Sequence, residues 1–276
     1  MSLPATRRSL PAASFYLRLL AEFLRASIQE AVAYRANFWI SLLHGILNLA
    51  TGVLGLVVLF SQVKQVRGWD LPAALALLGI YLTLDSLRHL VWSPSLDSLA
   101  GLEGDVWTGR LDYTLLRPVP AQFLASVRRW QPLALLDLLP GLALVGIAAG
   151  QLRLDLGAAD ALAFLVALAA ALLILYALLL AATSLIFWAP GVLFTWIFDS
   201  IFQMARYPIG LYPGWVRLLL TWAIPVGLIT SVPAQALTGR LESGLLLAAV
   251  FLALVLTLAA SLLFQRALRR YEGVGQ

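Results

Sequence analysis

The chain has 276 residues, of which 61% are hydrophobic and only 12% are charged, and its formal net charge is +5. Soluble domains carry about 25% charged residues, so this composition excludes an ordinary water-soluble domain and favours a protein whose solvent is a lipid bilayer. The arginines are scattered among apolar runs and do not form one basic face, which argues against nucleic acid as a partner.

The first predicted element is an amphipathic helix over residues 14–35. Apolar residues such as Leu20, Leu24 and Ile28 recur at helical spacing, while charged residues such as Arg18 and Glu22 take other positions. This pattern predicts a helix that lies at the membrane surface. A solvated helix that packs on a partner protein is the alternative interpretation.

Six membrane spans are predicted after this helix, because six segments each offer roughly 20 mainly apolar residues. They cover residues 38–60, 73–93, 132–150, 158–188, 191–209 and 244–264. The fourth segment has about 31 residues at ~1.5 Å each, which exceeds the thickness of the hydrocarbon core. We therefore expect it to tilt or to project into the cytosol.

Residues 210–237 are apolar enough to span, but Pro213, Pro225 and Pro233 divide them into short pieces. With six spans and the N-terminus inside, thirteen of the nineteen Lys and Arg residues lie on the cytoplasmic side. A seventh span would move the C-terminal arginine cluster outside and weaken this positive-inside bias. We therefore predict that 210–237 is a re-entrant segment that enters from the outer face, and that both termini are cytoplasmic.

The sequence contains few motifs for chemistry. The single lysine, Lys64, lies in Gln-Val-Lys-Gln-Val, which excludes a Gly-x-x-x-x-Gly-Lys-Ser/Thr phosphate loop. The chain lacks cysteine, and His44 and His89 lie far apart, so no metal site is predicted. Since no Ser/His/Asp set or catalytic carboxylate pair gathers on one membrane face, we predict a protein that is not itself an enzyme.

Four short motifs stand out along the chain. The first is the run Gly109-Arg110-Leu111-Asp112-Tyr113-Thr114-Leu115-Leu116-Arg117-Pro118. The others are Tyr34-Arg35-Ala36-Asn37-Phe38, the block Arg206-Tyr207-Pro208 with the prolines that follow it, and Leu268-Arg269-Arg270-Tyr271-Glu272. Together these motifs resemble those of ABC-2 permeases, the membrane subunits of ABC exporters whose ATPase is a separate polypeptide.

The resemblance implies one permease domain over residues 1–276 in the bacterial inner membrane. It implies a dimer, made of two copies or with a related permease, and two ATPase subunits on the cytoplasmic side that hold ATP and Mg²⁺. The implied function is export of a drug, an antibiotic or an amphiphilic, lipid-like molecule.

The cytoplasmic loop 94–131 is the predicted contact with the ATPase. Asp112 and Arg117 supply charge there, while Leu111, Leu115 and Leu116 supply a small apolar anchor, as transient interfaces require. The predicted coupling residues are Gly109, Arg110, Leu111, Asp112, Leu115, Leu116, Arg117 and Pro118. The alternative is that the loop only covers the ends of its own helices.

Charged residues inside spans cost about 2.5–3.5 kcal/mol each at the membrane centre. Asp85, Arg88 and Asp137 are predicted to gather with His89 toward the cytoplasmic side. Asp199 is expected near the middle of the fifth span, on one helix face with Gln203 and Arg206. The first set is interpreted either as a structural ion-pair network or as a contact with the substrate. For Asp199 the alternatives are a role in packing or a polar lining of the transport pathway or dimer seam.

The re-entrant segment is expected to be shaped by Tyr207, Pro208, Pro213, Pro225 and Pro233. This segment and Asp199 would also form the site of an ion-coupled secondary carrier, the first alternative function. The second alternative is a membrane-embedded enzyme that acts on lipid.

Overall fold

The protein was analysed as a computed structural model that describes residues 12–33, 35–152, 157–189 and 191–271. In these ranges all the regular elements are helices, and the only β geometry is an isolated bridge between Val66 and Trp69. Two residues of the sequence motifs, Tyr34 and Glu272, lie outside the described ranges. The prediction of an all-α polytopic membrane protein is confirmed.

Five helices of the described chain are long and apolar enough to cross a membrane. They are α2 (Arg35–Gln62), α3 (Leu71–Val91), α7 (Leu135–Gln151), α8 (Ala158–Ser184) and α12 (Ser243–Leu268). A 3₁₀ turn, Pro132–Ala134, precedes α7, and another, Leu185–Phe187, extends α8. These helices correspond closely to five of the six predicted spans.

The predicted span 191–209 is not one continuous helix of spanning length. It consists of α9 (Phe194–Phe202) and a 3₁₀ turn, Gln203–Arg206, which together extend about 21 Å and fall short of the ~30 Å hydrocarbon core. Helical structure ends because Pro208 pushes the preceding Tyr207 into an extended conformation, with φ −115° and ψ 151°.

The segment 210–237 forms a sharply bent pair of helices. α10 (Gly214–Leu218) continues as a π-helical turn, Leu219–Ala223, and α11 (Val226–Leu237) follows at 87° to this first piece. The break falls at Ile224 and Pro225, where a prolyl ring cannot continue the helix. The bent pair is the sixth candidate for a membrane-inserted element, either as a broken span or as a re-entrant loop.

Protein atoms cover the irregular backbone beside this bent pair. The Thr230 hydroxyl donates to the Ala205 carbonyl oxygen at 2.9 Å, and the Tyr212 hydroxyl donates to the Met204 carbonyl oxygen at 2.8 Å. Most residues of α11, including Pro233, are buried. A non-helical backbone at membrane depth is tolerated only when protein or a wet cavity covers it, and these contacts satisfy that requirement.

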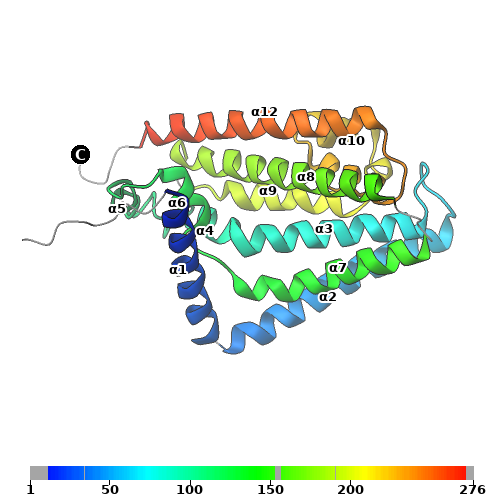
Figure 1. The fold of residues 1–276 in the computed structure, drawn as a ribbon, viewed down its shortest axis with the longest axis horizontal. Coiled ribbons are helices and arrows are strands. Elements are labelled where there is room, and N and C mark those ends of the chain that lie inside the picture. The colour runs from blue at the N-terminus through cyan, green and yellow to red at the C-terminus, as the bar shows by residue number, and fades with distance from the viewer. Residues whose placement is uncertain (1–11, 34, 153–156, 190, 272–276) are drawn as a thin grey trace, which may run out of the picture.

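Glycines let α3 and α7 approach closely. A Cβ atom on Gly79 of α3 would lie 2.8 Å from the backbone nitrogen of Val145, and one on Gly141 of α7 would lie 2.8 Å from that of Thr83. Small residues at such crossings bring helix backbones into van der Waals contact, the main attraction between helices in lipid. On the other side of the bundle, α8 packs against α12 (Figure 1). It also packs against α11.

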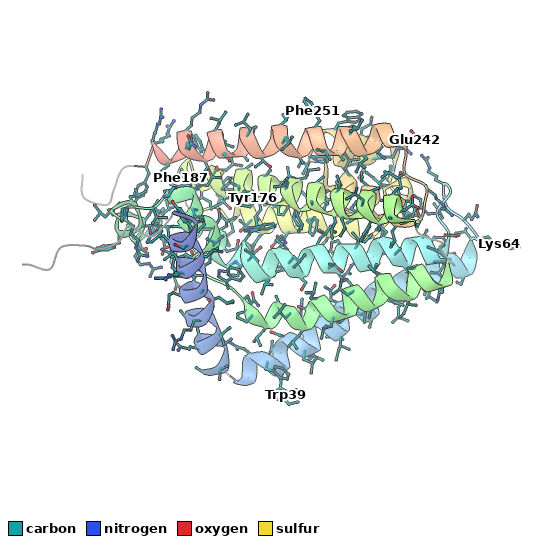
Figure 2. The ribbon with its side chains drawn as sticks, viewed as in Figure 1. Trp39, Lys64, Tyr176, Phe187, Glu242 and Phe251 are labelled. Carbon is teal, nitrogen blue, oxygen red and sulfur yellow. The ribbon has the colours of Figure 1, made fainter. Side chains whose placement is uncertain are left out.

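The bundle has two distinct ends (Figure 1). One, which we call the loop end, carries α1 (Ala12–Ala33), α4 (Ser93–Asp97), α5 (Leu111–Leu115), α6 (Ala121–Val127) and the last turn of α12. The other, the hairpin end, carries Lys64 and Glu242 (Figure 2). α1 crosses the bundle helices at a steep angle at the loop end, as a helix lying along a membrane surface would.

The hairpin end is held by contacts between distant segments. Arg240, which follows α11, donates to the Gly68 carbonyl oxygen at 2.5 Å and lies 3.7 Å from a carboxylate oxygen of Asp70. Arg67 has a left-handed φ of 49°, and its side chain packs over Gly210. The connection between α2 and α3 is therefore fixed to both ends of the bent pair.

Candidate functional site

A buried arginine organises the polar residues inside the bundle. Arg88, near the end of α3, is only 3% exposed. Its guanidinium group donates to Asp85 one turn earlier at 2.7 Å, and also to Asp199 of α9. The centres of the Phe198 and Phe202 rings lie 5.9 and 5.5 Å from the guanidinium carbon, so aromatic rings pack against the buried cation.

The structure thereby joins two groups of residues that the sequence analysis treated separately. Asp199 is the sixth residue of α9, because that helix begins only at Phe194. It therefore lies at the depth of Arg88, toward the loop end, and not at the middle of a long span. Asp199 can pair with Arg88 because α9 starts late, at Phe194. This late start is not visible in the continuous apolar run of the sequence.

A cavity of about 200 Å³ opens beside this cluster. α2 contributes His44 and Asn48, which the sequence analysis did not single out as site residues. The complete lining is His44, Asn48, Tyr81, Asp85, Arg88, His89, Asp199, Gln203 and Arg206. Polar and charged residues of α2, α3, α9 and the following 3₁₀ turn therefore meet in one chamber.

Arg206 differs from Arg88 in its partners. Its guanidinium carbon lies 5.5 Å from the centre of the Tyr81 ring, and one nitrogen donates to the Asn48 carbonyl oxygen at 3.4 Å. Within the described residues no carboxylate pairs with Arg206, and its Nε atom is buried without a hydrogen-bond partner. Arg206 is thus a cation without a paired carboxylate at the wall of this cavity.

Asp137 does not line the cavity, although the sequence analysis grouped it with Asp85 and Arg88. It lies on α7, and its side chain occupies the space beside Gly45 of α2 where a Cβ atom would otherwise stand. One of its carboxylate oxygens is buried without a hydrogen-bond partner. Asp137 therefore belongs to the contact between α2 and α7.

The loop 94–131 has its own buried ion-pair centre. Asp105 is 2% exposed and accepts hydrogen bonds from Arg110 Nε at 3.0 Å and from the guanidinium group of Arg128. The Asp105 amide donates to the Ser98 carbonyl oxygen, and its carbonyl oxygen accepts from the Leu111 amide. Asp105 was not predicted as a site residue, because an isolated aspartate in a glycine-rich loop resembles an ordinary turn residue.

The predicted coupling residues differ in what they do in the loop. Leu111 is 1% exposed and packs in the core, and Arg110 holds Asp105, so these two stabilise the loop itself. Gly109 supplies a left-handed turn with φ 73°. The residues that face outward are Leu115, Leu116, Arg117 and Pro118, and Leu116 is 82% exposed.

Further apolar side chains are exposed on the same loop. Tyr113 is 73% exposed, and Leu102 and Trp107 are also exposed. We call Leu102, Trp107, Tyr113, Leu115 and Leu116 the apolar loop residues. Their exposure follows from the turns at Gly101 and Gly109, both of which have positive φ.

The loop also contacts the ends of two helices of the bundle. Burial raises the pKa of Tyr271, just after α12, to about 12, and the charge of Asp112 beside it adds to the rise. Burial raises the pKa of Asp97 to about 6, although the hydroxyl group of Thr195 in α9 opposes that rise. Asp112 thus adjoins α12, and Asp97 adjoins α9 close to Asp199.

The comparisons with known proteins agree with this architecture. A family model described as "ABC-2 family transporter protein" matches residues 46–275, which include the loop 94–131, the bent pair and most of the cavity. No curated protein matches the chain. The chain therefore belongs to the ABC-2 family of transporter proteins, as a multi-pass membrane component of the transporter and not its ATPase.

Proposed function

We propose that the chain is the permease subunit of an ATP-driven exporter of amphiphilic molecules such as drugs, antibiotics or lipid-like compounds. Two permeases, either identical copies or this chain with a related one, would form the pathway. Two separate ATPase subunits would bind at the loop end, which would face the cytoplasm of a bacterial inner membrane. The membership in the ABC-2 family supports the division of labour between permease and ATPase.

The observation that carries the proposal is that the apolar loop residues are exposed although buried ion pairs hold the backbone of their loop in place. Side chains such as Leu116 and Tyr113 face outward, while the buried Asp105 with its two arginines holds the loop backbone beneath them. Apolar anchors surrounded by charges such as Arg117 are suited to a transient protein interface. A loop that only covered its own helix ends would bury these side chains.

The loop is also placed to transmit a movement of the ATPase into the membrane. Asp112 adjoins Tyr271 at the end of α12, and Asp97 adjoins Thr195 of α9. The Trp130 amide donates to the Ser27 hydroxyl of α1 at 3.0 Å. Closure of the ATPase subunits would therefore displace α1, α9 and α12 together, and opening of the pathway to the outside would follow.

The polar cavity supplies a candidate surface for the pathway or for the seam between permeases. Two of its lining residues, His44 and Gln203, are exposed at the surface of the single chain. Around them α2 exposes large apolar residues such as Leu43, Ile46 and Leu47. A second permease that covers this surface would enclose the cavity between the two chains.

The test is purification of the chain from its native membranes in mild detergent, followed by mass spectrometry of the bound polypeptides. We expect a partner with a phosphate-binding loop and ATPase activity. The amount of this partner that copurifies should fall at least tenfold for a Leu116→Asp variant. It should not change for Val63→Asp, a substitution at an exposed site of the hairpin end. Equal retention by both variants would refute docking at the apolar loop residues.

The polar cluster favours one second candidate, an ion-coupled carrier. Asp85 and Asp199 are both held by one arginine, and carboxylates inside a membrane bundle are typical of sites that couple ions to transport. Proteoliposomes that contain only this chain separate the two functions. Transport driven by a proton gradient without any ATPase would establish the carrier, and transport that requires ATP and the partner would exclude it.

A further inference from the structure

A groove separates the last turns of α1 from the start of α2. Two adjoining cavities form it, with volumes of about 730 and 410 Å³, and both are lined by Ala31, Pro132 and Leu133. Each volume lies in the range of small-molecule sites, about 300–1,000 Å³. None of the apolar loop residues and none of the residues that line the polar cavity lines this groove.

Two contacts of α1 with the body of the protein lie N-terminal to the groove or at its edge. The Tyr16 ring packs edge-on against Phe123, with centroids 5.1 Å apart. The other is the hydrogen bond that the Trp130 amide donates to the Ser27 hydroxyl. Beyond Ser27, side chains of α1 such as Ile28 and Val32 are exposed.

One part of the groove is apolar and the other is charged. The smaller cavity is lined only by apolar residues, which include Val32, Phe38 and Trp39. The larger cavity carries Glu30 and Arg129 on its walls. Within the described residues neither of these two charges forms an ion pair, with each other or with a third group.

The place of the groove fits the boundary of a bilayer. It lies at the loop end, where α2 and α7 begin, and Figure 2 shows Trp39 projecting outward at that end of α2. Tryptophan is enriched where hydrocarbon meets the headgroups. The charged part of the groove would thus meet headgroups, and the apolar part would meet acyl chains.

We propose that this groove binds one zwitterionic phospholipid of the leaflet at the loop end. The lipid phosphate would lie at Arg129, its ammonium group at Glu30, and its acyl chains along Phe38 and Trp39. Opposite unpaired charges on the walls match a headgroup that carries both signs, whereas Glu30 would repel the phosphate of a purely anionic headgroup. The proposal concerns a bound lipid and does not depend on what the protein transports.

The test is native mass spectrometry of the full chain released from nanodiscs that contain equal amounts of phosphatidylethanolamine and phosphatidylglycerol. We expect one phosphatidylethanolamine per chain, retained at least fivefold over phosphatidylglycerol. Arg129→Ala should lower this retention at least fivefold, and Glu30→Gln should reduce the preference to less than twofold. The matched controls on α1, Arg25→Ala and Glu22→Gln, do not line the groove and should behave as the unchanged chain.

A steric variant tests the groove without altering its charges. Ala31→Trp would fill the space shared by both cavities and should abolish retention of the lipid. Soluble phosphoethanolamine at millimolar concentration should not displace the lipid, because it lacks the chains. The proposal is overturned if the unchanged chain holds both lipids equally. It is also overturned if folded Ala31→Trp or Arg129→Ala protein keeps its lipid. If a variant fails to fold, the preference of the unchanged chain for phosphatidylethanolamine over phosphatidylglycerol is the deciding result.

Discussion

Arg88 of α3 and Asp199 of α9, which are 111 positions apart in the sequence, form a hydrogen-bonded ion pair inside the bundle. The same guanidinium group also holds Asp85. One cation is thus shared by carboxylates from two helices, and those helices are joined to the loop that is the proposed contact with the ATPase. Because an unpaired charge is expensive within a membrane, this pairing fixes how α3 and α9 lie against each other.

The first prediction concerns the unequal roles of the two partners. Arg88→Ala leaves two carboxylates without a cation and should destabilise the protein by about 3–5 kcal/mol. Asp199→Asn leaves Arg88 paired with Asp85 and should cost only about 1–2 kcal/mol. Thermal unfolding of the purified variants measures both effects. Equal losses would show that Asp199 and Arg88 act as an isolated pair.

Transport by the Asp199→Asn variant distinguishes a structural role from a pathway role. If the Asp199 carboxylate lines the pathway, export should fall at least tenfold although the folded protein reaches the membrane in normal amounts. The control is Ser200→Ala, the neighbouring residue of α9, whose hydroxyl donates only to the Trp196 carbonyl oxygen. Export at the normal rate in both variants would assign Asp199 to packing.

The second prediction concerns Asp105, which is too deeply buried to touch a partner. Asp105→Asn removes the charge that pairs with Arg110 and Arg128. We expect a local loss of about 3 kcal/mol, seen as faster hydrogen exchange over residues 98–116. ATPase binding should fall with it. Glu103→Gln, an exposed carboxylate in the same loop, should change neither property.

The sequence predicted the long elements well because their signal is composition alone. Five runs of roughly 20 apolar residues became five helices, and the prolines at 213 and 225 correctly marked breaks in the segment before α12. The predicted break at Pro233 is wrong, because Pro233 lies inside α11, which continues through it. The sequence could not show that the run 191–209 is only partly helical. Hydropathy measures how apolar a segment is, and Tyr207 is extended for a local steric reason, the proline after it.

The polar site was predictable in its members but not in its pairing. Asp85 and Arg88 are three residues apart on one helix, so their contact follows from helical geometry. The contact of Arg88 with Asp199 depends on the relative depth of two helices, and so does the arrival of His44 at the same cavity. Depth is set by where each helix starts and by tertiary packing, which a single sequence does not encode locally.

The third prediction concerns pH. Burial holds the pKa of Asp97 at about 6 in the folded protein, above the value of about 4 for an exposed carboxyl group. The proton on Asp97 therefore contributes to the stability of the fold. This contribution is complete below about pH 4, decreases as the pH rises, and is lost above about pH 6. Asp97→Asn should raise stability by about 1–3 kcal/mol at pH 7.5, and the gain should shrink toward zero near pH 4. Thermal unfolding across this range provides the measurement, and a gain that does not vary with pH would exclude this ionisation as its source.

The fourth prediction uses two glycines on either side of one helix contact. A Cβ atom on Gly79 would meet the backbone nitrogen of Val145 at 2.8 Å, and a backbone atom cannot move aside without separating α3 from α7. Gly79→Ala should therefore destabilise the protein by about 2 kcal/mol or more, since overpacking at a close contact typically costs about 1–3 kcal/mol. Gly146 of α7 meets no atom within 4 Å, so Gly146→Ala should be neutral or stabilising by up to about 1 kcal/mol through helix propensity. Thermal unfolding in one detergent compares the two variants, and a Gly79→Ala protein as stable as Gly146→Ala would show that backbone contact does not hold α3 against α7.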